Sequence, residues 1–340
     1  MKLRNWALLA AFSVSMAGAS VLAAEKEPVK KAEPKATKVE KKIEAFTDPA
    51  KAGPAIKMQG EYEGKASAAK LGIQVIALGG ENFRAVFYDG GLPGAGAEGK
   101  AKAEVEAKAQ DGKVAFEGQG YSASLADGKL IGKTPKGESF EAKRVIRKSP
   151  TLGMKAPAGA MVLFDGSSAD AFNNGKMTDQ KLLMMGAVTK RAFQDFTLHL
   201  EFILPFMPEA RGQARGNSGV YIQNRYEVQV LDSFGLKGLN NECAGIYTVM
   251  APKVNMCLPP LQWQTYDIDF TAAKFDASGK KTANAKITVK HNGVVVHEGF
   301  EIPKKTGGGA AEGPTAGPIQ LQNHGGDPVY YRNVWVVEKK

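Results

Sequence analysis

From Met58 onward, short runs of alternating apolar and polar residues follow one another, and glycines separate them. The runs GEYEGKASA, IQVIALGG, NFRAVFYDGG, KVAFEGQG and YSASLADGK fit the two-residue period of β-strands. Several such runs at close spacing predict a small antiparallel β domain over residues 56–150. The segment AKAEVEAKA at 101–109 contains good helix formers, but its strict alternation favours a strand.

A second β-rich region is predicted over residues 158–340. The run DFTLHLEFIL at 195–204 places its large apolar side chains at one parity and Thr197, His199 and Glu201 at the other. The dipeptide Asn292-Gly293 is a strong signal for a two-residue hairpin turn. Many antiparallel strands with long loops and little helix indicate a jelly-roll β-sandwich, so the whole protein is expected to be all-β.

The N-terminal residues differ in character from both predicted domains. In residues 1–24, Lys2 and Arg4 precede an apolar run that ends in small side chains, which predicts a secretory signal peptide and hence export to the periplasm, cell surface or medium. A retained membrane anchor is the alternative, but the run is short and interrupted by serine and glycine. Residues 25–55 are rich in Lys, Glu, Ala and Pro and predict a disordered linker. No other segment approaches membrane-spanning length.

The charge of the chain bears on its binding partners, and its two cysteines bear on a disulfide. The chain has 45 Lys and Arg against 35 Asp and Glu, a net charge of +10. Its lysines are interleaved with glutamates and form no arginine stripe with aromatic residues, so we expect no nucleic acid partner. In an exported chain, Cys243 and Cys257 are expected to form one disulfide that closes a short loop, with two free core thiols as the alternative.

One predicted hairpin, GNSGVYIQNRYEVQVLDS at 216–233, has an unusual polar face. It carries no lysine, although lysine is common elsewhere in the chain. Side chains that both donate and accept hydrogen bonds, together with carboxylates and flat rings, suit the binding of polyhydroxylated molecules. A concave sheet that holds a sugar is therefore predicted, and an inert sheet covered by loops is the alternative. The polar face and its ends comprise Asn217, Ser218, Tyr221, Gln223, Glu227, Gln229 and Asp232, joined by Gln320, Gln322 and His324 from the last strands.

The ionisable residues of this region supply candidates for acid–base chemistry. Glu227, Asp232 and Glu201 are the carboxylate candidates, and His324, in a glycine-bordered loop, is the leading histidine. The two histidines that flank the Asn-Gly turn, His291 and His297, are expected at the surface. No compact metal-binding motif is present, so a divalent metal could be held only by dispersed ligands, with Glu227 and His324 as candidates.

Several phrases occur together in one order and resemble the 3-keto-disaccharide hydrolase domain family. They are LFDG, DFTLHLEF, GNSGVYIQ, YEVQVLDS, AGIY, WQTYDI, NGV and GPIQLQNHG through YRNV, and they span nearly all of the second predicted domain. The resemblance implies a concanavalin-like β-sandwich. It also implies action on glycosides whose sugar carries a ketone at carbon 3, which acidifies the neighbouring C–H bond and permits elimination followed by hydration, or net hydrolysis.

The resemblance also implies roles for individual residues. Glu227 and His324 would transfer protons or bind a metal, with Asp232 and Glu201 as supporting carboxylates. Trp263 and Trp335 would belong to the interior of the fold, and the loop 241–257 would cover the site, pinned by the predicted disulfide. Phe172 departs from the tryptophan that the family often has after LFDG, which we interpret as a packing difference. The residues expected to bind substrate are Asn217, Tyr221, Gln229, Gln322 and Arg332.

The sequence thus predicts an exported enzyme, a hydrolase or lyase acting on 3-keto-glycosides. Two alternatives stay open: a carbohydrate-binding protein without turnover, because the same fold serves lectins, and a cell-surface structural protein. A convergence of Glu227, His324 and a second acidic group in one site would favour the enzyme.

Overall fold

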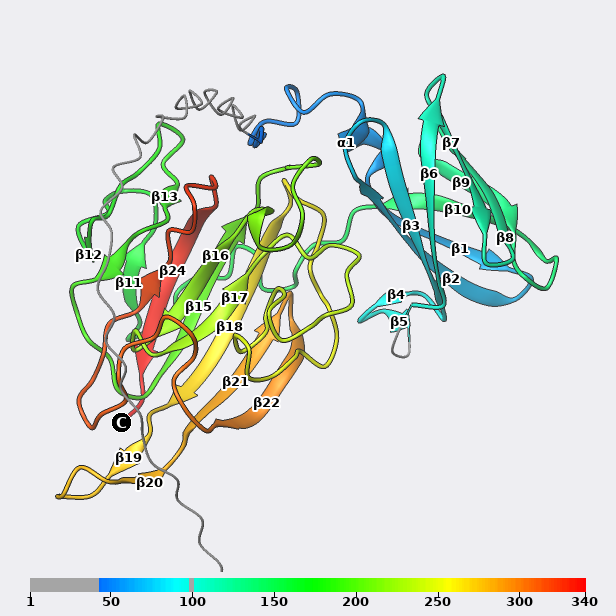
Figure 1. Ribbon diagram of the computed structural model, residues 1–340. Coiled ribbons are helices and arrows are strands. Elements are labelled where there is room, and N and C mark those ends of the chain that lie inside the picture. The colour runs from blue at the N-terminus through cyan, green and yellow to red at the C-terminus, as the bar shows by residue number, and fades with distance from the viewer. Residues whose placement is uncertain (1–42, 98–100) are drawn as a thin grey trace, which may run out of the picture. The chain divides into compact units, whose positions relative to one another are not determined.

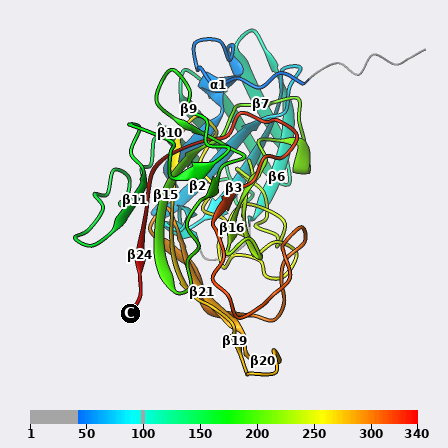
Figure 2. The same ribbon diagram turned by 90° about the vertical axis from the view of Figure 1, so that its left-hand side faces the viewer.

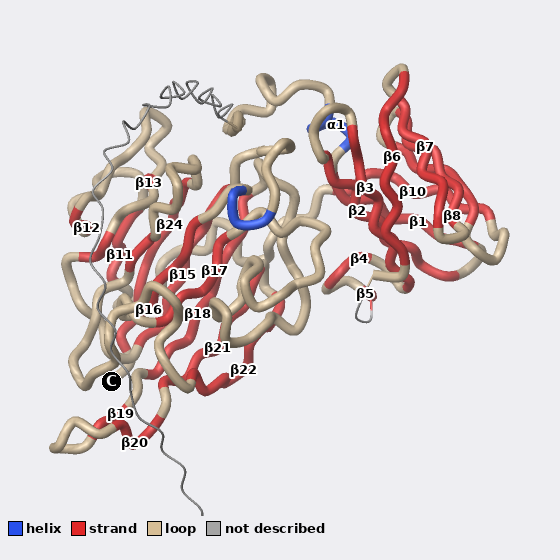
Figure 3. Tube along the Cα trace, viewed as in Figure 1, coloured by secondary structure: helices blue, strands red, loops and turns tan. Residues whose placement is uncertain are grey.

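A computed structural model describes residues 43–97 and 101–340. The predicted signal peptide and most of the predicted linker lie outside this range. Strands dominate the described chain, as the red segments of Figure 3 show, and long loops connect them. The helical elements among the described residues are α1 (Ala55–Met58) and the short 3₁₀ turn η1 (Gly212–Ala214).

The first predicted domain is confirmed as antiparallel β and proves to be a closed barrel in the order β1-β10-β9-β8-β7-β6-β3-β2. Its interior is filled by alternate side chains, among them Phe83, Phe87 and Phe116, each at most 2% exposed. The segment 101–109, predicted as a strand, contributes β6. The barrel strands are β1 (Gly60–Ala66), β2 (Ala69–Ala77), β3 (Asn82–Asp89), β6 (Ala103–Gln110), β7 (Lys113–Gly118), β8 (Tyr121–Ala126), β9 (Lys129–Lys133) and β10 (Ser139–Val145), with the short parallel pair β4 (Leu92–Pro93) and β5 (Gly96–Ala97) beside them.

The second region is a β-sandwich, as predicted. Its larger sheet has seven strands in the order β11-β24-β15-β18-β21-β22, with β13 paired to β24. The members of this sheet are β11 (Met161–Phe164), β13 (Leu183–Met184), β15 (Phe196–Ile203), β18 (Trp263–Thr271), β21 (Ala285–His291), β22 (Val294–Ile302) and β24 (Tyr330–Glu338).

The smaller sheet has five strands in the order β12-β14-β23-β16-β17. Figures 1 and 2 show β15 of the larger sheet and β16 of the smaller sheet in separate layers. The five strands are β12 (Phe172–Asn173), β14 (Val188–Thr189), β16 (Ser218–Ile222), β17 (Tyr226–Val230) and β23 (Gln320–Leu321). A separate hairpin is formed by β19 (Lys274–Phe275) and β20 (Lys281–Ala283).

The core lies between the two sheets and fixes which way every other side chain points. Leu198 and Leu200 of β15 and Val220 and Val228 of the β16–β17 hairpin are fully buried in one apolar cluster. Because successive side chains of a strand point to opposite faces, the residues between them point away from the core. Glu201 therefore faces outward from the seven-stranded sheet, and Glu227 faces outward from the five-stranded sheet.

Two tight turns set the register of the strands that matter most. The β16–β17 connection consists of Gln223, Asn224 and Arg225, the first two with φ of 53° and 57°, and its three-residue length places Tyr221 opposite Glu227. The β21–β22 turn consists of Asn292 and Gly293, with φ of 51° and 80°, as the sequence predicted. Left-handed conformations at both central residues match the twist of adjacent antiparallel strands.

Two expectations about histidine and cysteine were wrong. His291 is buried against Phe202 and Tyr266, and burial lowers its pKa to about 3. His297 is buried because the loop after β17 covers it and its Nε2 lies 2.7 Å from the Ala244 carbonyl oxygen. A nearby tight turn does not keep either ring in solvent.

Cys243 and Cys257 are free thiols in the structure, not a disulfide. Both are buried, and Cys243 Sγ lies 3.2 Å from the hydroxyl of Tyr266. The loop that contains them does not depend on a covalent pin, because Ala244 N–H and Gln229 N–H donate backbone hydrogen bonds that join the loop to β17. Within residues 43–97 and 101–340, no helix is both long and apolar enough to span a membrane.

Candidate functional site

The outer face of the five-stranded sheet, called here the Glu227 face, is centred on a buried carboxyl group. Glu227 is only 2% exposed, and its Oε2 accepts a 2.8 Å hydrogen bond from the hydroxyl of Tyr221. The carboxyl group lies over Gly219, where a Cβ, if one were present, would come within 2.2 Å of Oε1. Burial raises the pKa of Glu227 to about 7, although the hydrogen bond from Tyr221 opposes this shift. Glu227 can therefore exchange protons near neutral pH.

Tyr221 and Gln322 extend this polar floor. The Tyr221 hydroxyl also lies 3.0 Å from the carbonyl oxygen of Gly307, and Gln322 Nε2 donates to that hydroxyl at 3.4 Å. Burial and the adjacent Glu227 carboxyl raise the pKa of Tyr221 far above its usual value, so its hydroxyl stays protonated. Gln322 Oε1 is buried and has no partner among the described residues. An acceptor is thus left free beside the Glu227–Tyr221 pair.

Asn217 and Gln229 complete the buried part of the face, and Gln213 connects them. Asn217 Nδ2 donates to Gln213 Oε1 at 3.1 Å, and Gln229 Nε2 donates to the same oxygen at 3.0 Å. Sequence reasoning did not identify Gln213, because it lies in a loop, where side chains follow no regular alternation between two faces. The structure alone shows that it contacts two residues predicted to bind substrate.

Asp327 is a second carboxyl group of this region that the sequence did not reveal. Its Oδ2 accepts a 2.9 Å hydrogen bond from the backbone N–H of Asn217. Burial raises the pKa of Asp327, although the hydrogen bond from Asn217 and the nearby His324 oppose the shift. His324, three residues earlier, is exposed, as predicted for a loop residue. The structure therefore brings Asp327 and His324 to the edge of the Glu227 face.

Four half-buried residues surround the buried floor: Gln213, Tyr247, Gln322 and Asp327. Gln213, Gln322 and Asp327 hydrogen-bond directly to floor residues. The backbone N–H of Tyr247 donates to the Glu227 carbonyl oxygen, so the 241–257 loop contacts the strand that carries Glu227. The residues that border the buried floor are therefore polar, which suits a hydrophilic ligand.

Asp232, predicted as a supporting carboxylate, is engaged elsewhere. Its Oδ2 accepts a 2.6 Å hydrogen bond from Arg215 Nε, and both side chains are buried. Its Oδ1 accepts a hydrogen bond from the backbone N–H of Phe234. This ion pair follows the end of β17, so the contacts of Asp232 support the strand that carries Glu227.

Glu201 and Arg332 do not join the Glu227 face. They lie on the outer face of the seven-stranded sheet, called here the Glu201 face, where Arg332 Nε donates to Glu201 Oε2 at 2.7 Å. Arg332 also stacks over Trp263, with its guanidinium carbon 3.9 Å from the ring centroid. Trp335, predicted for the interior, is buried on this outer face and stacks on His199.

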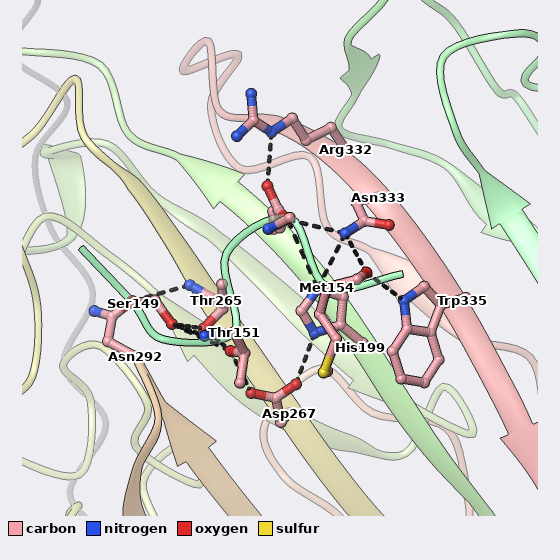
Figure 4. Close-up of polar contacts among 12 residues, drawn as sticks. Ser149, Thr151, Met154, His199, Thr265, Asp267, Asn292, Arg332, Asn333 and Trp335 are labelled. Carbon is pink, nitrogen blue, oxygen red and sulfur yellow. Dashed lines mark hydrogen bonds and ion pairs between the residues drawn. The ribbon is translucent and has the colours of Figure 1, made fainter. Parts of the chain in front are cut away.

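The segment 149–155 lies across the Glu201 face and is joined to it by hydrogen bonds (Figure 4). Gly153 N–H donates to Glu201 Oε1 at 2.6 Å, and Thr151 Oγ1 donates to Asp267 Oδ2 at 2.8 Å. Asn333 Nδ2 donates both to the Met154 carbonyl oxygen and to Glu201 Oε1, each at 2.9 Å. This covering segment explains why a face that points away from the core is buried.

The pKa values of the buried glutamates differ between the two faces. Burial by itself would raise the pKa of Glu201, but the His199 ring, 3.8 Å away, and hydrogen bonds from Asn333, Arg332 and Gly153 together lower it to about 2. Burial would lower the pKa of His199, yet its bonds to Asp267 and Glu201 raise it, and His199 Nδ1 lies 2.6 Å from Asp267 Oδ1. Glu201 is thus a permanently ionised, fully bonded carboxylate at neutral pH.

No group of three or more His, Cys, Asp or Glu side chains suited to hold a metal ion occurs in the part of the chain that the structure describes. Glu227 and His324 stay predictions as metal ligands.

Comparison with known proteins identifies relatives of the sandwich. Residues 159–337 match the 3-keto-alpha-glucoside-1,2-lyase-like domain. A solved structure of a candidate glycosyl hydrolase from Parabacteroides distasonis is 33% identical with a TM-score of 0.50, covering 54% of this chain and 85% of that one. Another candidate glycosyl hydrolase from the same organism is 16% identical with a TM-score of 0.41, covering 58% of this chain and 99% of that one. No curated protein matches the chain.

Proposed function

Because the chain belongs to the 3-keto-alpha-glucoside-1,2-lyase-like domain family, we propose that it cleaves glycosides of 3-keto sugars on the Glu227 face. The observation that carries this proposal is the Glu227 carboxyl group, buried among polar side chains with a pKa of about 7. A base for carbon acids must be ionised at working pH yet basic enough to accept a proton, and a raised carboxyl pKa meets both needs.

The first chemical step is removal of the proton at carbon 2, next to the ketone. Glu227 takes this proton, and the C–H electron pair moves into the carbon 2–carbon 3 bond to give an enolate. Donors near the developing oxyanion stabilise it. We assign this role to Tyr221, whose raised pKa keeps its hydroxyl protonated and whose acceptor in the structure, the Glu227 carboxylate, is neutralised when Glu227 takes the proton.

Departure of the aglycone completes the elimination. The enolate collapses, the carbon 3 carbonyl re-forms, a carbon 1–carbon 2 double bond is created, and the glycosidic oxygen leaves with the electrons of its bond to carbon 1. That oxygen needs a proton, and His324 and Asp327 at the edge of the face are the groups able to supply one. Addition of water across the new double bond then gives net hydrolysis.

The Glu201 face has no part in this chemistry. Glu201 has four partners, and its low pKa makes it a poor base. Arg332 is paired with Glu201 and stacked on Trp263, so its guanidinium group is engaged within the Glu201 face.

The test compares two buried glutamates on different sheets. Wild type, Glu227→Gln and Glu201→Gln are assayed with methyl 3-keto-α-glucoside and with the unoxidised methyl α-glucoside. We expect cleavage of the keto sugar alone, a loss of roughly 10³-fold or more in kcat for Glu227→Gln, and retention within about fivefold for folded Glu201→Gln. Binding of the sugar without turnover by wild type would instead assign the protein to the lectins. Loss of turnover in Glu201→Gln alone would place the chemistry on the other sheet.

We further propose that the protein is exported, because residues 1–24 have the layout of a signal peptide. Cell fractionation with mass spectrometry of the N-terminus tests this: a mature chain beginning near residue 25 outside the cytoplasm is expected, and a full-length cytoplasmic chain would contradict it.

A further inference from the structure

The hydrogen bonds of Asn217 use all of its donors and leave its acceptor free. Its backbone N–H donates to Asp327 at 2.9 Å, and its Nδ2 donates to the carbonyl oxygen of Gln213 at 2.8 Å and to Gln213 Oε1 at 3.1 Å. Its Oδ1 is buried and has no hydrogen-bond partner among the described residues. A buried acceptor without a partner is rare in folded proteins and calls for an explanation.

Two backbone carbonyl groups fix the orientation of this amide. A carbonyl oxygen can only accept, so the Gln213 carbonyl must face the nitrogen of Asn217 and not its oxygen. The side chain of Gln213 is fixed in the same way, because its Nε2 donates to the Asn241 carbonyl oxygen at 2.8 Å. Gln213 Oε1 therefore faces Asn217, and the free oxygen of Asn217 is an outcome of the backbone geometry.

Gln213 also contacts Gln229, and this contact differs from the one with Asn217. Gln229 Nε2 donates to Gln213 Oε1, while Gln229 Oε1 accepts from the backbone N–H of Val230 at 3.0 Å. Both ends of this side chain are used within the protein. Gln229, which stays a predicted substrate-binding residue, contacts Gln213, and Asn217 is the residue whose side-chain acceptor is left free.

We infer that Asn217 Oδ1 accepts a hydrogen bond from a hydroxyl group of the keto sugar, and that Gln213 is the positioning residue that holds it ready. This inference rests on the proposed function. The ketone oxygen has no hydrogen to donate, so the donor to Asn217 Oδ1 is one of the remaining sugar hydroxyl groups. A site built to pair with a hydroxyl rejects the analogue that lacks it, because the buried acceptor is then left unpaired.

The test measures binding in a background that cannot turn the sugar over. In Glu227→Gln protein, dissociation constants are determined by calorimetry for methyl 3-keto-α-glucoside and for its 2-deoxy, 4-deoxy and 6-deoxy analogues. We expect one deoxy analogue to bind about 10- to 100-fold more weakly than the parent sugar. Adding Asn217→Ala should reduce that ratio to within about threefold for the same analogue.

Gln213 variants then separate positioning from simple packing. Gln213→Leu removes the side-chain acceptor but keeps the backbone carbonyl. We therefore expect the logarithm of the discrimination ratio to fall to about half of its original value. Gln213→Glu keeps an acceptor oxygen for Asn217 and should retain more of the ratio than Gln213→Leu. Gln110→Leu, an exposed glutamine of β6, is the matched control and should leave the ratio unchanged. A purely structural role would weaken binding of the parent sugar and of every deoxy analogue equally.

Different results would overturn different claims. Equal binding of parent and deoxy sugars, or an intact ratio in Asn217→Ala or Gln213→Leu, overturns the inference even if wild type cleaves the keto sugar. A ratio that collapses as expected, in a protein whose wild type shows no cleavage, supports the inference and overturns the proposed enzyme function. No binding of the parent sugar at millimolar concentration would overturn both.

Discussion

The two outer faces of the sandwich carry the same kind of residue in opposite states. Glu201 and Glu227 are both about 1–2% exposed, and both point away from the core. Three hydrogen-bonding partners and the nearby His199 ring lower the pKa of Glu201 to about 2, whereas Glu227 has one side-chain partner and a pKa raised to about 7. Burial alone therefore does not mark a catalytic carboxylate. What distinguishes Glu227 is incomplete pairing, together with the free acceptors Asn217 Oδ1 and Gln322 Oε1 nearby.

Among changes that leave both glutamates in place, the largest expected effect comes from filling the space above Gly219. A Cβ there would lie 2.2 Å from Glu227 Oε1 and 3.0 Å from its Cδ, so Gly219→Ala must displace the carboxyl group. We expect kcat to fall by roughly 100-fold, because a misplacement of about 1 Å has this cost. Thermal unfolding should change little, since the displaced atoms are the end of a flexible side chain. Gly313→Ala, whose new Cβ would lie 3.8 Å from Arg225 Nη2, is the control and should keep full activity. Normal activity in Gly219→Ala would refute the placement of the reacting carboxyl group.

The second effect is on the free energy of unfolding. Its change with pH should have opposite signs for the two glutamates. Glu201 has a lowered pKa, so it stabilises the fold above its unfolded value of 4.5 and loses this contribution as pH falls toward 2. Glu227 has a raised pKa, so the folded state binds its proton more tightly and stability falls as pH rises from 4.5 to about 7.

At pH 8, Glu201→Gln should therefore destabilise the protein by about 2–3 kcal/mol, because it also leaves Arg332 without its partner. Glu227→Gln should be neutral or stabilising by about 1–2 kcal/mol at the same pH. Urea unfolding at pH 5 and pH 8 measures both. Destabilisation of equal size by the two substitutions at pH 8 would show that the carboxyl groups have equivalent environments.

The smallest effect is the pH dependence of the wild-type rate near neutrality. Ionised Glu227 is the base, so kcat/KM should rise with pH and reach half its plateau near pH 7, a change of about twofold between pH 7 and 8. Glu201→Gln should give the same midpoint. A midpoint near the ordinary glutamate pKa of 4.5 would contradict the claim that burial makes Glu227 more basic.

Alternation along the strands was sufficient to predict the sandwich and the outward side of each strand. It could not distinguish the two outer faces, because Glu201 and Glu227 have the same parity relative to the core. Placing them on different sheets depends on which strands pair, as β15 does with β18 and β24. Grouping Arg332 with the substrate-binding residues had the same cause.

The residues that the sequence missed lie where no local period exists. Gln213 belongs to a short turn and contacts Asn217 four residues later, whereas Asp327 belongs to a glycine-bordered loop and reaches Asn217 through a tertiary contact. His291 and His297 were misplaced for a related reason, since their burial comes from packing against β15, β18 and a distant loop and not from their own hairpin. Loop positions are set by the packing of the whole chain.

The most direct test of the Glu227 face is proton exchange at carbon 2 of methyl 3-keto-α-glucoside in heavy water, followed by NMR and compared among wild type, Glu227→Gln and Glu201→Gln. We predict that wild type and Glu201→Gln accelerate loss of the carbon 2 proton, by exchange or by elimination, and that Glu227→Gln does not. Proton loss that persists in Glu227→Gln would contradict the assignment of Glu227 as the base.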